Sequence, residues 1–251
     1  MYNFSLLIDD RVAADFSEKI AVSDSLMICN LEIEDCIEGK NIAELDGEHI
    51  ERIRNLLILH AKKIVLLNCS KSVTEQEYYK KLFRKAHMLG VGYLNVPVDE
   101  KQDEAYNECF RKVNNIGKAY GIGVLVENIS TASIQDDKNI THFYKKIKDH
   151  NTGLVFNPLE YVKLKSHPFF HEFYNSKLKD ETRFLRVNDG LFVDGTAVLP
   201  AQGNAEIKEL ASILIARGYK GYFSFTPYLK DMDVKDYSYV INGFKKLLTL
   251  M

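Results

Sequence analysis

The sequence offers one carboxylate that is well placed to do chemistry, at the end of a strand-like stretch. Glu127 is the second-last residue of the segment Gly121–Asn128, in which Val124–Val126 form the apolar run of a short buried strand. An acid in this position is costly in free energy unless another group pairs with it or an ion binds it. We therefore expect Glu127 to have a charged partner or to serve as the base in a proton transfer.

Polar side chains also stand at the ends of the other predicted strands. They include amides, a guanidinium, further carboxylates and a hydroxyl, namely Asp9, Asn30, Asn68, Asp99, Asn157, Arg186, Asn188, Asp189 and Thr226. If the strands are parallel, their carboxyl ends meet on one side of the sheet, and we expect these side chains to surround one cavity. None of the seven histidines lies at a predicted strand end.

Strands and helices alternate along the chain. Apolar runs predict strands at 4–8, 25–29, 64–67, 92–98, 121–128, 152–156, 183–187 and 222–225. Helical spacing of apolar residues predicts helices at 11–21, 49–62, 75–89, 103–120, 140–150, 168–176, 204–217 and 237–250. The acidic segment Glu32–Glu38 is interpreted as a loop. Thr74 and Glu77 match a capping box for the helix 75–89, and Gly121 is expected to end the helix 103–120.

This order predicts an α/β fold with a single (β/α)8 TIM barrel over residues 1–251. Strands rich in Leu, Val, Ile and Phe are typical of a parallel sheet that is buried on both faces. Eight such strands with crossover helices most simply close into a barrel, and a length of 251 residues suits one barrel domain. A doubly wound open sheet is the alternative, but it would need a glycine-rich phosphate loop after an early strand, and the sequence has none.

The composition argues against several classes of partner. The formal net charge is −2, and the basic residues are spread along the helices. The sequence therefore predicts no basic patch that would bind nucleic acid or an anionic membrane. No apolar run approaches the ~20 residues of a membrane span, and the first residues lack a secretory pattern. The four cysteines lack metal-binding spacing. We expect a cytoplasmic protein with reduced thiols and a small-molecule ligand. The sequence does not decide whether the protein forms a homo-oligomer.

Four stretches of the second half resemble the xylose-isomerase-like barrels, which include sugar isomerases, sugar epimerases and metal-dependent endonucleases. They are GVLVENIS, GLVFNPLEY, RFLRVND and LPAQGNAEIKELASILIARGYKGYFSFTPY. The resemblance covers about residues 121–228. The first half of the chain matches the family only in its alternation of strands and helices. It implies a TIM barrel that acts on a sugar, sugar phosphate or polyol by moving a proton next to a carbonyl.

The resemblance also implies a divalent metal (Mn, Mg, Zn or Co) held by Glu, Asp, His and Glu at four strand ends. Glu127 matches the first of these ligands, but Asn157, Arg186 and Thr226 stand at the other three positions. Glu160 stands where sugar epimerases place a histidine. These positions offer one carboxylate, an amide, a hydroxyl and a cation, which together would bind a divalent ion poorly. We therefore expect no metal here.

Two interpretations of Glu127 and Arg186 follow from their predicted positions, two strands apart. In the first, they form a buried salt bridge that replaces the metal. In the second, Arg186 holds an anionic or hydroxyl-rich ligand, with Glu127 as the catalytic base and Asn157, Arg186, Asn188, Thr226, Glu160 and Asn68 as substrate-binding residues. Two functions accordingly stay open. One is an isomerase or epimerase, and the other is a non-catalytic barrel that binds a sugar-like or anionic ligand.

Overall fold

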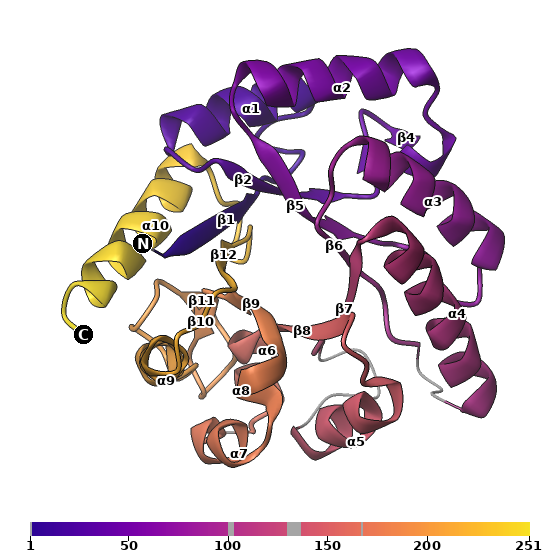
Figure 1. Cartoon of the computed structure of the whole chain (residues 1–251). Coiled ribbons are helices and arrows are strands. Elements are labelled where there is room, and N and C mark those ends of the chain that lie inside the picture. The colour runs from indigo at the N-terminus through magenta and orange to yellow at the C-terminus, as the bar shows by residue number, and fades with distance from the viewer. Residues whose placement is uncertain (1, 100–102, 130–136, 167) are drawn as a thin grey trace. The chain divides into compact units, whose positions relative to one another are not determined.

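A computed structural model describes residues 2–99, 103–129, 137–166 and 168–251 (Figure 1). Eight strands of these residues form a closed parallel barrel in the order β1-β12-β9-β8-β7-β6-β5-β2. Their bounds are β1 Asn3–Leu7, β2 Asn30–Glu34, β5 Lys63–Asn68, β6 Tyr93–Asn95, β7 Gly123–Glu127, β8 Thr152–Phe156, β9 Thr182–Arg186 and β12 Tyr222–Phe225. The predicted TIM barrel is confirmed, and the alternative of an open sheet is excluded.

Helices connect these strands. Their bounds are α1 Phe16–Ser25, α2 Gly47–Leu59, α3 Gln76–Met88, α4 Glu104–Tyr120, α5 Asp137–Ile147, α6 Pro158–Lys163, α7 Phe170–Asn175, α8 Leu178–Glu181, α9 Ile207–Ala216 and α10 Val234–Leu248. Two short antiparallel pairs add to the barrel, β3 Cys36–Ile37 with β4 Lys40–Asn41, and β10 Asp189–Gly190 with β11 Ala197–Val198. The sequence did not predict α6, α8 or either antiparallel pair, because each is too short to show a hydrophobic period.

The chain divides into two compact units. The first comprises Met1–Phe4, Glu127–Lys145 and Leu154–Met251, and the second comprises Ser5–Val126 and Lys146–Gly153. The predicted organisation as one domain stays a prediction.

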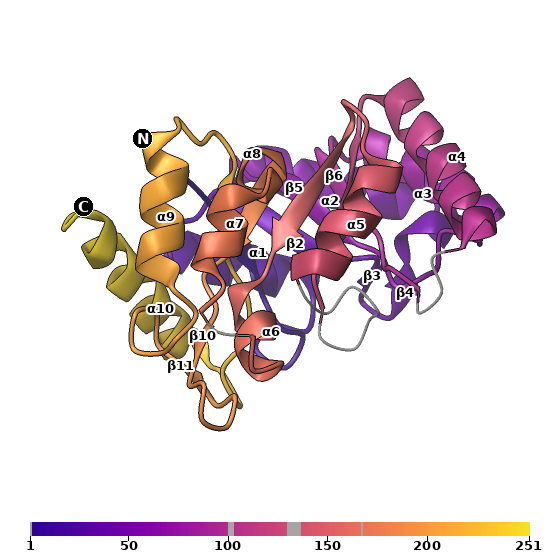
Figure 2. The same ribbon diagram turned by 90° about the horizontal axis from the view of Figure 1, so that it is seen from below.

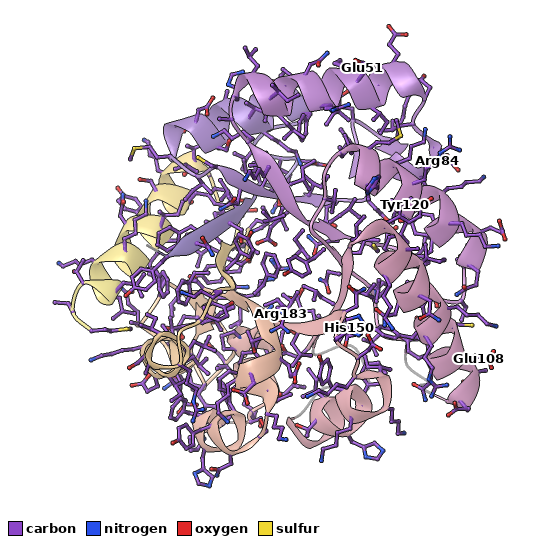
Figure 3. The ribbon with its side chains drawn as sticks, in the orientation of Figure 1. Glu51, Arg84, Glu108, Tyr120, His150 and Arg183 are labelled. Carbon is purple, nitrogen blue, oxygen red and sulfur yellow. The ribbon has the colours of Figure 1, made fainter. Side chains whose placement is uncertain are left out.

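In the second unit, local sequence signals start and stop the helices. The side chains of Asp46 and Asp103 accept hydrogen bonds from backbone N–H groups in the first turns of α2 and α4. Gly121 ends α4 with a left-handed φ of 68°, as the sequence predicted. Helices α1 and α2 lie side by side (Figure 1). Glu51 on α2, Arg84 on α3 and Glu108 on α4 point outward, so each helix keeps a charged solvent face (Figure 3).

The second strand of the barrel is the clearest error of the sequence prediction. The segment 25–29 is not a strand, because α1 continues to Ser25 and the chain then turns at Met27 with a φ of 55°. The strand is Asn30–Glu34, which begins five residues later than predicted and overlaps the segment Glu32–Glu38 that was interpreted as a loop. Its acid Glu32 is buried and accepts a 2.6 Å hydrogen bond from the Ser5 hydroxyl. A buried acid that has a partner makes the sequence of a strand polar, so the search for apolar runs did not predict β2.

The predicted capping box before α3 is also wrong. The N-cap residue of α3 is Glu75, whose side chain makes no capping hydrogen bond. The hydroxyl of Thr74 instead lies 2.9 Å from that of Ser72. The Thr74 side chain thus belongs to the loop that follows β5.

In the first unit, aromatic side chains fill the space around β8, β9 and β12. Phe156 of β8 packs against Phe173 of α7 with ring centroids 4.6 Å apart, and Phe184 of β9 stacks on Tyr222 of β12. Helices α7 and α9 lie side by side (Figure 2). In the parallel pair of β12 and β9, Ser224 lies directly opposite Arg186. This register brings two polar side chains of neighbouring strands together.

Candidate functional site

An ion pair between Glu127 and Arg186 is the centre of the candidate site in the first unit. Arg186 Nε donates to Glu127 Oε1 at 3.2 Å, and Nη2 donates to Oε2 at 3.0 Å. The guanidinium also donates from Nη1 to the Ser224 hydroxyl at 2.7 Å. The Arg186 side chain is 4% exposed and that of Glu127 is 15% exposed. The predicted pairing is therefore confirmed as a two-point contact, and its carboxylate side reaches solvent.

Three further predicted residues join Glu127 through a chain of hydrogen bonds. Asn157 Nδ2 donates to Glu127 Oε1 at 3.2 Å, and Asn188 Nδ2 donates to Asn157 Oδ1 at 3.3 Å. The hydroxyl of Thr226 donates to Asn188 Oδ1 at 2.9 Å. Asn157, Asn188 and Thr226 are all buried. The ends of β7, β8, β9 and β12 thus contribute to one continuous polar group, which is called the Glu127 chain below.

Two predicted site residues have their described contacts elsewhere. Glu160 lies in α6, and its carboxylate forms a 2.7 Å ion pair with Lys163, one turn further along the helix. Asn68 ends β5 in the second unit, where its Oδ1 accepts a 3.0 Å hydrogen bond from Asn95. Whether either residue binds a ligand stays a prediction.

Two residues that hold the site in place were not predicted from the sequence. The side chain of Asn128 accepts from the backbone N–H of Asn157 and donates to its carbonyl oxygen, both at 2.7 Å. Ser224 binds Arg186, as described above. The available signals were an amide directly after Glu127 and a serine inside the aromatic strand Tyr222–Phe225. Both side chains are fully buried, and a buried polar group in such a place needs a partner.

Asp189 anchors the loop that follows β9. Its buried carboxylate accepts hydrogen bonds from the backbone N–H groups of Gly190 at 2.8 Å, Gly203 at 3.0 Å and Ala205 at 2.9 Å. The Tyr228 hydroxyl donates to the carbonyl oxygen of Val198 in the same loop at 2.7 Å. Asp189 therefore organises backbone, and its described bonds are not to the Glu127 chain.

The burial of Asp189 predicts a pH dependence of stability. Burial raises the pKa of Asp189 above its usual value of 3.8, and hydrogen bonds from backbone N–H groups, including the three named above, oppose this only in part. Because the native pKa is the higher one, the contribution of Asp189 to stability is complete below the unfolded pKa and is lost as the pH rises through the native pKa. We expect the free energy of unfolding of the wild type, minus that of Asp189→Asn, to fall as the pH rises from below the usual Asp pKa of 3.8 through the raised native pKa. Urea unfolding of both proteins across this range measures it, and a difference that grows with pH would contradict it.

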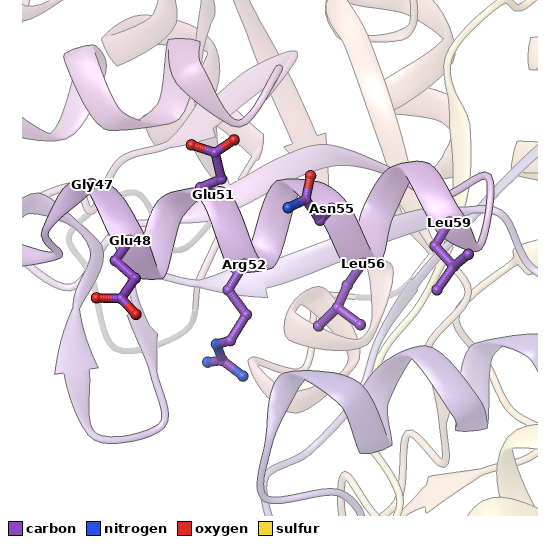
Figure 4. A pocket seen from close by; sticks show the side chains of 7 residues that line it. All are labelled: Gly47, Glu48, Glu51, Arg52, Asn55, Leu56 and Leu59. Atoms are coloured by element: carbon purple, nitrogen blue, oxygen red, sulfur yellow. The ribbon is translucent and has the colours of Figure 1, made fainter.

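A shallow groove of about 650 Å³ lies along the exposed face of α2 in the second unit (Figure 4). It is lined by one helix only, through Gly47, Glu48, Glu51, Arg52, Asn55, Leu56 and Leu59. Arg52 at its edge is already paired with Glu38 of the turn between β3 and β4. None of its lining residues belongs to the Glu127 chain, so this groove is separate from the candidate site.

Two absences hold for the part of the chain that the structure describes. Among those residues, no three His, Cys, Asp or Glu side chains gather closely enough to hold a metal ion. None of the helices there has the length and apolar character that a membrane crossing requires.

Solved structures share this fold over nearly the whole chain. A xylose isomerase domain protein from Alicyclobacillus acidocaldarius aligns with a TM-score of 0.78 at 12% identity, covering 100% of this chain and 99% of its own. A xylose isomerase-like TIM barrel protein from Mycobacterium smegmatis, solved in complex with magnesium, gives 0.74 at 16% identity over 100% and 97%. A sugar phosphate isomerase/epimerase from Parabacteroides distasonis gives 0.70 at 14% identity over 98% and 94%.

The fold is therefore that of the xylose-isomerase-like TIM barrels, as the four sequence stretches implied. No protein-family model and no curated protein matches the sequence. At identities of 12–16% the structural likeness establishes the fold alone, because one fold can host many different functions.

Proposed function

We propose that this protein is a barrel that binds a neutral, sugar-like ligand at Glu127 without metal-dependent catalysis. The observation that carries the proposal is that Arg186 engages both oxygens of the Glu127 carboxylate. A carboxylate held by a guanidinium remains a good acceptor for ligand hydroxyl groups, and its exposed edge can be reached from solvent. Glu127 and the hydrogen-bonded chain behind it would then orient the ligand.

The residues of this site do not fit a divalent metal. The guanidinium lies 3.0 Å from Glu127 Oε2 and would repel a second cation. The side chain of Asn157 presents its Nδ2 donor to Glu127, whereas a metal requires oxygen or nitrogen lone pairs. We therefore derive no reaction step through a metal ion.

The same contacts argue for a neutral ligand over an anionic one. Three donor atoms of Arg186 are engaged, two by Glu127 and one by Ser224, and its side chain is almost fully buried. An anion would have to displace Glu127 before it could bind the guanidinium, and the displaced carboxylate would repel it. A hydroxyl-rich molecule can donate to Glu127 without breaking the ion pair.

An isomerase or epimerase that uses Glu127 as its base is the second candidate. It is favoured by the partial exposure of the carboxylate and by structural relatives such as the sugar phosphate isomerase/epimerase named above. A proton transfer next to a carbonyl needs a base within hydrogen-bonding reach of the carbon acid. Glu127 would first have to give up part of its contact with Arg186, which makes this candidate the weaker one.

Binding without metal is tested on protein treated with a chelator. In the protein as purified, before any chelator is added, we expect elemental analysis to find no stoichiometric Mn, Mg, Zn or Co. We also expect calorimetry against a panel of aldoses, ketoses and polyols to find binding that Glu127→Gln weakens about tenfold or more, the usual effect of losing a charged hydrogen-bond partner. Glu209→Gln, the same change at an exposed position on α9, is the matched control. One tightly held ion per chain, or equal affinities of the Glu127→Gln and Glu209→Gln proteins, would overturn the proposal.

Incubation of the same sugars in deuterated water separates the two candidates. An isomerase or epimerase exchanges the proton on the carbon next to the carbonyl, and mass spectrometry detects the added deuterium. We expect no exchange above the level without protein. Exchange that Glu127→Gln abolishes, with folding intact, would establish the second candidate.

The remaining expectations are kept as proposals. They are a cytoplasmic location and the absence of a nucleic-acid or membrane partner, with the choice between a monomer and a homo-oligomer left open. Gel filtration with light scattering would decide the last of these.

A further inference from the structure

We propose that Thr226 and Asn188 are positioning residues that turn the Asn157 amide toward Glu127. The four side chains form a hydrogen-bonded chain with one direction, in which every donor points toward the carboxylate. The orientation is a property of the free protein. It matters for ligand binding only through the proposed function, on which this consequence rests.

The direction of the chain follows from the charge at its end. Glu127 is paired with the guanidinium of Arg186 and is therefore a carboxylate, which can only accept hydrogen bonds. The atom of Asn157 that lies 3.2 Å from Oε1 must then be Nδ2. This leaves Asn157 Oδ1 facing Asn188, so Asn188 must present its own Nδ2, at 3.3 Å.

Thr226 completes the chain at its far end. The Oδ1 atom of Asn188 faces the Thr226 hydroxyl at 2.9 Å, and a hydroxyl can rotate to donate to it. If this donor is removed, Asn188 loses one of the two contacts that distinguish its amide orientations, and it is the shorter one. The flipped Asn188 would present Oδ1 to Asn157, and a flipped Asn157 would present its own Oδ1 to the Glu127 carboxylate.

The surroundings leave the amide orientation as the main freedom of Asn157. Asn128 holds both the N–H and the carbonyl oxygen of its backbone at 2.7 Å, so the backbone is fixed at this position. Asn157, Asn188 and Thr226 are buried, which limits replacement of a lost donor by water. Side-chain orientation in this group is therefore set from within the protein, one residue to the next.

The proposal is tested on the ligand-free protein by the side-chain amide signals of Asn157 in proton–nitrogen NMR spectra, assigned by their loss in Asn157→Ser. In Thr226→Val, which keeps the shape and removes the donor, we expect the Asn157 amide to exchange with water about fivefold faster or more, since the lost hydrogen bond frees the flip. Thr226→Ser keeps the hydroxyl and should stay within about twofold of the wild type.

Asn188→Asp is the second variant, because Thr226→Val can also lower stability. Its carboxylate accepts from Thr226 but has no hydrogen to give to Asn157, so the same acceleration is expected. Thermal unfolding confirms that each variant is folded at the temperature of the NMR experiment. Unchanged exchange in folded Thr226→Val or folded Asn188→Asp would overturn the proposal, as would equal acceleration in Thr226→Ser and Thr226→Val. Absence of sugar binding with the expected exchange pattern would reject the proposed function and leave the positioning role standing.

Discussion

Replacement of Arg186 by Met is expected to lower the free energy of unfolding by about 3 kcal/mol, because it removes one partner of a buried ion pair. The Glu127 carboxylate would lose both guanidinium contacts, and Ser224 would lose its donor at 2.7 Å. The asparagine donor at 3.2 Å and the partly exposed edge of the carboxylate limit the loss. Urea unfolding, followed by circular dichroism, measures the change.

Two further variants separate charge from packing. Arg186→Lys keeps the positive charge but cannot make the parallel two-point contact, so its loss should be intermediate. Glu127→Gln introduced into the Arg186→Met protein removes the uncompensated charge, and the double variant should be more stable than Arg186→Met alone. A double variant less stable than Arg186→Met would show that the charge of Glu127 is not what Arg186 compensates.

Gly203→Ala is the second change with a large expected effect. A Cβ atom on Gly203 would overlap Asp189 Oδ1 and the carbonyl oxygen of Gly190, and it would lie 2.7 Å from the Gly190 carbonyl carbon. Two of these atoms are backbone, so a side-chain movement cannot relieve the overlap. We expect a loss of about 3 kcal/mol, with the Asp189 anchor broken and the loop before α9 displaced.

Gly243→Ala is the matched control for this prediction. Gly243 lies exposed within α10, and a Cβ atom there would meet nothing within 4 Å. Since alanine is the better helix former, this change should raise the free energy of unfolding by about 0.5–1 kcal/mol. If both alanine variants had the same stability, steric overlap at Gly203 would not be the cause of its expected loss.

Much of the fold could be read from apolar patterning. The predicted strands at 152–156 and 222–225 agree with β8 and β12 residue for residue, because both are short, almost wholly apolar runs. The same reasoning failed at β2, where the interior acid Glu32 and its partner Ser5 replace apolar side chains. A pattern method has no means of recognising a strand whose buried face is satisfied by a distant hydroxyl.

The sequence predicted most of the residues that lie in the candidate site, but it did not predict most of the hydrogen bonds between them. Parallel strands bring their carboxyl ends together, which was enough to expect Glu127 near Arg186 and to include Asn157, Asn188 and Thr226. Ser224 was missed because its role depends on the register that sets it opposite Arg186. Asn128 was missed because it acts on the backbone of Asn157, which sequence spacing does not reveal.

Residue order and type were enough to predict the alternation of strands and helices, the barrel that this alternation implies, and the kinds of polar residue at the strand ends. These are properties of residue order and type, and local periodicity records them. The folded chain was needed to show which polar atoms meet, that Asp189 holds a loop, and that the donors behind Glu127 all point the same way. Hydrogen bonds of this kind depend on strand register and amide orientation, which are fixed only when residues far apart in the chain come within about 3 Å of one another.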